Sequence, residues 1–195
     1  MQLRCPGHRH PSEAPRKSHG SIPCHTATIE VSMNLYVTDI NPQKCAIALD
    51  DKTLVESLVY IAQTLCSACS HLGMWNSSMH TAIKTAHPIT RWVSESKHNF
   101  RWTYHYAKAL CDEYRHRFNL EHTEEKFVRS CWRAFKDHPL RPSKTEMTPF
   151  INLTPYASDA LTHICYQRLL RERLFDSKSV WTKRSPPSFY MEKVA

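Results

Sequence analysis

Scarcity of glycine is the feature that most constrains how this chain folds. Its 195 residues include three glycines, Gly7, Gly20 and Gly73, so only one lies beyond residue 32. Hairpin turns and the Gly-rich loops that cradle phosphates depend on glycine's access to positive φ. The sequence therefore argues against β-sandwiches, Rossmann folds and phosphate-binding loops. It favours helices joined by proline-containing loops, and we predict an all-α fold.

The first 32 residues differ in composition from the remainder of the chain. They contain four prolines and four histidines and show almost no apolar periodicity. A segment of this kind buries too little apolar surface to offset the entropy lost on ordering. We predict a disordered extension over residues 1–32 and a single compact helical domain over residues 33–195. Met33 is then an alternative to Met1 as the start site.

Apolar periodicity and capping residues predict about five helices. Asn41 and Pro42 suit the N-cap and first position of a short helix through Leu49. Asp50 or Asp51 caps a longer helix that ends between Ser70 and Gly73. One buried face of this helix is expected to carry Leu54, Leu58, Ile61, Ala62 and Leu65.

Later helices are expected in the second half of the chain. They are predicted over residues 88–97, over Asn99–Phe118, after a cap at Thr123, and over residues 158–175. Leu161, Ile164, Cys165 and Leu169 form the predicted inner side of the last one. Pro139, Pro142, Pro149 and Pro155 enforce an irregular segment before it.

Targeting and cysteine usage indicate a cytoplasmic protein. No run of 18 apolar residues occurs, and no apolar stretch marks a signal peptide, so we expect no membrane contact. The eight cysteines are then expected as reduced thiols. Cys66 and Cys69 form a CxxC pair, but no second pair follows at zinc-finger spacing. We therefore expect no metal and no cofactor.

The basic charge of the chain points to a polyanionic partner. The formal net charge is +8 and the isoelectric point is about 9.1. Residues 87–102 and the tail at residues 181–190 combine cations with aromatic rings, a pairing that suits nucleic acid. The alternative is that the rings pack in the core and the cations are solvated. Candidate nucleic-acid contacts are Arg91, Trp92, Asn99, Trp102, Arg117, Trp181, Lys183 and Arg184.

From Met33 onward the sequence resembles a family of small bacteriophage proteins. The matching pieces are Met33–Val37, Asp51–Val55, Ala62–Leu65, His87-Pro88 with Trp92, Ser96, Asn99 and Trp102, Glu113-Tyr114 with Arg117, and Trp181–Arg184. The helix that begins near Asp51 is in turn similar to the corresponding helix of the phage pyrimidine-dimer DNA glycosylase/lyase of the endonuclease V type. In those enzymes Asp-x-His is followed, seven residues after the histidine, by a catalytic glutamate.

That second resemblance implies amine chemistry on damaged DNA. An N-terminal amine attacks the sugar carbon, a Schiff base forms, and the glutamate assists proton transfer. In this sequence Thr53 stands at the histidine position and Tyr60 at the glutamate position. Glu56, one turn earlier, is the candidate carboxylate. Lys52 is the candidate amine, and burial beside the helix N-terminus would have to lower its pKa for it to react. Alternatively, Asp51 caps the helix and Lys52 is a surface residue.

Three functions follow as hypotheses. The first is a phage-type DNA-binding protein related to DNA repair or modification enzymes, a glycosylase/lyase relative with an altered active site. The second is a catalytically lapsed DNA-binding protein. The third is a non-catalytic phage protein that binds and inhibits a host protein, in the host bacterial cytoplasm. DNA is the expected partner in the first two.

Overall fold

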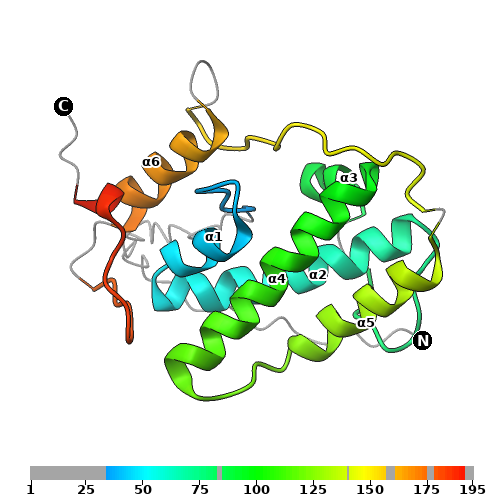
Figure 1. The fold of residues 1–195 in the computed structure, drawn as a ribbon, viewed down its shortest axis with the longest axis horizontal. Coiled ribbons are helices and arrows are strands. Elements are labelled where there is room, and N and C mark those ends of the chain that lie inside the picture. The colour runs from blue at the N-terminus through cyan, green and yellow to red at the C-terminus, as the bar shows by residue number, and fades with distance from the viewer. Residues whose placement is uncertain (1–33, 83–84, 140, 157–160, 175–177, 192–195) are drawn as a thin grey trace, which may run out of the picture. The chain divides into compact units, whose positions relative to one another are not determined.

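The computed structural model describes residues 34–82, 85–139, 141–156, 161–174 and 178–191, all within the second of the chain's two units, residues 33–195. Their regular elements are all helical, which confirms the predicted fold class (Figure 1). They are α1 Pro42–Ala48, α2 Asp51–His71, α3 Pro88–Glu95, α4 Lys97–Phe118, α5 Glu125–Asp137, α6 Thr162–Leu174 and the 3-10 helix η1 Ser188–Tyr190. The extension predicted over residues 1–32 and the predicted start of the last helix at Ser158 lie outside the described residues.

Two of the predicted caps are present at the start of the helical array. The side chain of Asn41 accepts hydrogen bonds from the backbone N–H groups of Gln43 and Lys44 and so begins α1. Of the two candidate caps for α2, Asp50 takes the role, since its carboxylate accepts from the N–H of Thr53 at 2.7 Å. Asp51 is therefore free to interact elsewhere.

The later helix starts differ from those predicted. Ser96 accepts from the N–H of Asn99, so α3 ends at Glu95 and α4 begins at Lys97. The prediction that Thr123 caps α5 is wrong, because Glu124 occupies the N-cap position and makes no side-chain cap bond. Nδ1 of His122 instead accepts from the Glu124 N–H at 3.2 Å, so the imidazole satisfies a donor near the cap.

The core is built around α2, which packs on α3, α4 and α5. Its predicted apolar face is confirmed, because Leu54, Leu58, Ile61, Ala62 and Leu65 are all buried. Residues 34–37, which precede α1, are non-helical and also buried. None of the helices in the described part of the chain combines the length and the apolar content that a membrane crossing requires.

The inner face of α6 differs from the prediction. Cys165 and Leu169 are buried as expected, but Leu161 and Ile164 are 66% and 47% exposed. Since α6 begins at Thr162, Leu161 precedes the helix, and Ile164 lies on the side opposite to Tyr166 and Leu170, which complete the buried face. The predicted inner face is therefore rotated toward solvent relative to the face that is buried in the structure.

Candidate functional site

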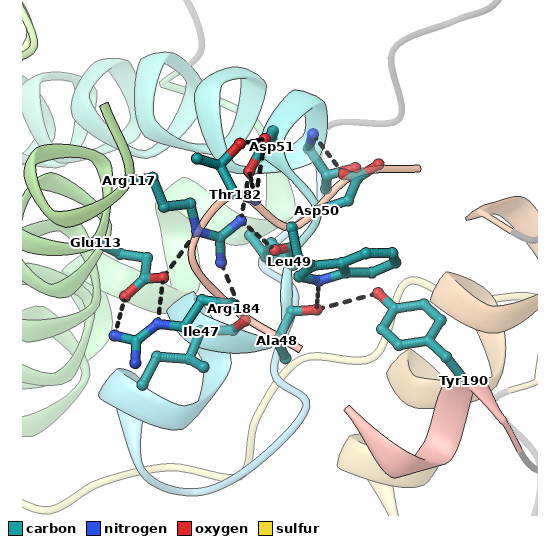
Figure 2. Close-up of polar contacts among 12 residues, drawn as sticks. Ile47, Ala48, Leu49, Asp50, Asp51, Glu113, Arg117, Thr182, Arg184 and Tyr190 are labelled. Atoms are coloured by element: carbon teal, nitrogen blue, oxygen red, sulfur yellow. Dashed lines mark hydrogen bonds and ion pairs between the residues drawn. The ribbon is translucent and has the colours of Figure 1, made fainter. Parts of the chain in front are cut away.

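A buried arginine on α4 joins three parts of the chain. The side chain of Arg117 is 0% exposed, and its guanidinium donates to Oε1 of Glu113 at 2.8 Å and to Oδ1 of Asp51 at 3.0 Å. It also donates to the backbone carbonyls of Leu49 at 2.8 Å and Ile47 at 3.2 Å, at the end of α1 (Figure 2). The guanidinium is thus committed to acceptors within the protein, and a DNA phosphate would have to displace them to reach it.

The tail at residues 180–184 completes this cluster. Asp51 donates its N–H to the carbonyl of Val180 and accepts, on its carboxylate, from the N–H and the hydroxyl of Thr182 at 3.1 and 2.7 Å. Arg184 reaches both oxygens of Glu113, at 2.9 and 2.8 Å. Figure 2 shows Thr182 and Arg184 on opposite sides of Arg117. The tail therefore ties the N-terminus of α2 to the C-terminal half of α4.

Charge within the cluster is balanced by direct pairing. Burial raises the pKa of Glu113, but hydrogen bonds and charge from Arg184 and Arg117 outweigh it, so the pKa is lowered overall. Hydrogen bonding to Glu113 likewise raises the pKa of Arg184. Glu113 is therefore a carboxylate between two guanidinium groups, an arrangement that stabilises the fold and offers no free proton acceptor.

The remaining tail candidates also contact the protein. Nζ of Lys183 donates to the carbonyl of His116 and to the side chain of Asn119, at the C-terminus of α4, where cations are favoured. The indole of Trp181 lies on Tyr190, with ring centroids 5.0 Å apart, and both residues donate to the carbonyl of Ala48. Burial raises the pKa of Tyr190, so its hydroxyl stays a donor.

The candidate catalytic pair lies on the first turns of α2. Lys52 and Glu56 approach to 4.0 Å, and their side chains are 73% and 40% exposed. Thr53 and Tyr60, which stand at the histidine and glutamate positions of the enzyme motif, are both buried, unlike this exposed pair. The Tyr60 hydroxyl lies 3.3 Å from Nδ1 of His87, and burial raises the pKa of Tyr60 to about 12.

The predicted aromatic cluster of residues 87–102 packs inside the protein. Trp92 donates to the carbonyl of Pro149 at 2.7 Å, and Trp102 donates to that of Ile40 at 2.8 Å. Asn99 donates to the carbonyl of Trp92 and exchanges hydrogen bonds with Thr148. These three residues hold the irregular segment 148–150 against α3 and α4.

Arg91 is the exposed one among the candidate contact residues of that segment. It lines an open groove of about 930 Å³ together with His71, Glu95 and Thr148. Arg91 therefore lies in a groove that also contains the acid Glu95. The indoles of Trp92 and Trp102, by contrast, donate to backbone carbonyl groups inside the protein. We infer that the aromatic content of residues 87–102 is mainly structural.

Two features were missed in the sequence and have recognisable signals. Glu113 and Arg117 are four residues apart, the spacing of an ion pair on one helical face. Cations also recur at helical spacing along α4 and α5. These are Lys97, Arg101 and Lys108 on α4, and Lys126, Arg129, Arg133 and Lys136 on α5.

Comparison with known proteins gives one match. Residues 33–126 match the protein family described as pyrimidine dimer DNA glycosylase. The matching segment includes α1 to α4 and the start of α5, and with them Asp51, Glu113 and Arg117, whereas the tail lies outside it. No curated protein and no solved structure gives a match. Over these residues, slightly less than half of the chain, the sequence is similar to that family.

Proposed function

We propose, from the relation of residues 33–126 to pyrimidine dimer DNA glycosylases, that this protein binds DNA and that its glycosylase/lyase site has been altered. The observation that carries the proposal is Tyr60. By the sequence resemblance it stands at the position of the catalytic glutamate of those enzymes, and its side chain is a buried phenol beside His87. A phenol whose pKa is about 12 cannot stabilise a developing cation as a carboxylate does.

DNA remains the partner that the charge of the chain favours. The net charge of +8 attracts a polyanion and makes association sensitive to salt. Loss of catalytic groups does not remove this attraction, because phosphate binding needs surface cations and no nucleophile. A DNA-binding protein with a changed active site therefore explains both the basic charge and the residues at the motif positions.

A second candidate is an enzyme in which Lys52 supplies the amine. The 4.0 Å approach of Lys52 to Glu56 brings an amine and a carboxylate together on the related helix. At an abasic site such an amine would condense with the C1′ aldehyde and release water, giving an imine. Lysines used as nucleophiles are activated by a desolvated pocket or a neighbouring cation. The 73% exposure of Lys52 favours the non-catalytic proposal.

Borohydride trapping on a duplex with one abasic site separates the two candidates. Borohydride reduces any imine to a stable amine and leaves a covalent protein–DNA complex. We expect salt-sensitive binding without such a complex, while a competent pyrimidine-dimer glycosylase forms one under the same conditions. A complex that is lost in Lys52→Ala and kept in Lys44→Ala would establish the second candidate instead, because Lys44 is an exposed lysine away from the α2 start.

Direct titration of DNA tests the binding itself. The wild-type protein is expected to bind duplex DNA at low ionic strength and to lose affinity steeply as salt rises. Absence of any salt-sensitive affinity for DNA would contradict the proposal. The hypothesis of a phage protein that inhibits a host protein would then become the leading one, and a pull-down from host lysate is its test.

A further inference from the structure

We propose that the exposed faces of α4 and α5 form the docking surface for the phosphate backbone of duplex DNA. This inference rests on the proposed function, because it names the surface that binding would use. The surface, here called the α4–α5 strip, comprises Lys97, Arg101, Lys126, Arg133 and Lys136. None of the five is a matching position of the family resemblance, and none belongs to the tail.

The cations of the strip differ from most others in their lack of acidic partners. In the part of the chain that the structure describes, none of the five has a carboxylate within ion-pair distance, 4.0 Å. Arg101 lies over the ring of Phe135, and Lys126 over that of Phe127. Cations that no carboxylate neutralises are the ones that attract an external anion.

Aromatic stacking brings the two helical faces together. Tyr104 of α4 stacks on Trp132 of α5 with ring centroids 4.2 Å apart and an angle of 9° between the planes. Trp132 also stacks on Phe135, whose ring lies 5.9 Å from the guanidinium carbon of Arg101. Arg101 therefore lies beside the aromatic seam through which α4 packs on α5. Since the two helices meet at this seam, we infer that their exposed cations share one surface.

Charge along the strip is uneven. Near the N-terminus of α5, Glu125 pairs with Arg115 and Arg129, and on α4 Asp112 pairs with Lys108, so this end is close to neutral. The opposite end carries Lys97, Arg101, Arg133 and Lys136 against Asp137 on α5 and Glu146 beside the start of α4, while Glu95 there is paired with Lys144. Cations outnumber acids at that end, so an anion would be drawn to it.

The dimensions and chemistry suit duplex DNA. From Lys126 to Lys136 the strip spans about 15 Å of helix axis, and duplex DNA carries one charge per about 1.7 Å. Several phosphates can thus face the strip at once. The rings of the seam already stack on one another, which leaves them poorly placed to receive bases. Recognition is therefore expected through phosphates, without preference for sequence.

The tail cations are less suited to this role. Arg184 is held by both oxygens of Glu113, and Lys183 donates to His116 and Asn119. A phosphate would have to replace these acceptors before either cation could bind it. Arg133 and Lys136 have no such contact to give up in the described part of the chain.

Fluorescence anisotropy with a labelled mixed-sequence duplex tests the strip in the full-length chain. The test variant is Arg133→Ala with Lys136→Ala. The control is Lys44→Ala with Lys178→Ala, which removes the same charge from exposed positions outside the strip. At about 0.1 M salt we expect the test variant to lose tenfold or more in affinity. The slope of log affinity against log salt should fall by roughly two units, one for each lost phosphate contact. The control should keep the wild-type slope.

Both variants change exposed side chains and should therefore fold normally, which an unchanged melting midpoint verifies. If the wild-type protein binds the duplex and the test variant loses no more affinity than the control, the α4–α5 strip is not the docking surface, although the protein does bind DNA. If the wild-type protein does not bind at all, the proposed function itself fails. A test variant that binds single strands normally but loses the duplex supports the strip as a duplex surface.

Discussion

At the scale of single residues, Arg117 is the side chain on which most of the polar network depends. A buried guanidinium is costly to desolvate, and it is stabilised here by two carboxylates and two carbonyls. Its acceptors come from the α1–α2 junction and from α4, so one side chain fixes their mutual position. The family resemblance includes this arginine, and its role in the structure is internal.

Substitution of Arg117 is expected to be strongly destabilising. Arg117→Ala leaves Glu113 buried beside a cavity and should lower the free energy of unfolding by about 3–5 kcal/mol. Urea unfolding followed by tryptophan fluorescence measures this change. Lys108→Ala, which breaks an exposed i,i+4 pair with Asp112, should cost less than about 1 kcal/mol. Equal effects in the two variants would mean that the buried network contributes little.

Glu113 makes stability depend on pH. Its folded pKa is lowered below the ordinary value of 4.5, so its contribution is fully present above that value and is lost as the pH falls through the folded pKa. Glu113→Gln should therefore be less stable than wild type at pH 7, with a difference that shrinks below about pH 4.5. Unfolding measured from pH 7 to pH 3 checks this. A difference that stays constant over the range would assign the effect to packing.

At the scale of elements, α2 carries the apolar face on which the other helices pack. Leu58 and Ile61 are 1% and 0% exposed. Truncating either to alanine should lower the free energy of unfolding by about 2–5 kcal/mol, through lost transfer free energy and a residual cavity. Leu161→Ala is the matched control, because that leucine is exposed, and it should change stability by less than about half a kcal/mol.

The tail is an element of the fold, and Trp181 is its anchor. Trp181→Ala removes the contact with Tyr190 and the donor to Ala48, so the melting midpoint should fall by several degrees. DNA affinity, measured at a temperature where the variant is folded, should stay within about twofold of wild type. A loss of 1 to 3 kcal/mol on single-stranded DNA without a change in melting would instead assign Trp181 to base stacking.

Local signals explain why some elements were predictable and others were not. The caps at Asn41 and Asp50 and the apolar face of α2 depend on neighbours within a few residues, and all were visible in the sequence. The environment of Trp92 depends on Pro149, and that of Trp181 depends on Ala48, 133 residues away. Since Arg and Trp suit a DNA surface and a buried network equally well, only the distant partner decides between these roles.

At the scale of the whole molecule, residues 1–32 are predicted to be dispensable. Their composition offers little apolar surface to bury, and Met33 offers a second start. A protein that starts at Met33 should keep its helical circular dichroism and melt within about 2 °C of the full-length chain, since that interval corresponds to well under 1 kcal/mol. A large fall in the midpoint would move the domain boundary toward the N-terminus.

The return of the tail to Ala48 and Asp51 also has a consequence during synthesis. Ribosomes release the N-terminal part of a chain first, so α1 and α2 emerge long before residues 180–190 exist. Until those residues appear, Asp51 lacks Thr182, Glu113 lacks Arg184, and the carbonyl of Ala48 lacks its two donors. Products that stop before residue 180 would therefore keep an open, easily unfolded helix junction, which cellular proteases degrade preferentially. The last contacts to form thus distinguish a finished molecule from a prematurely terminated one.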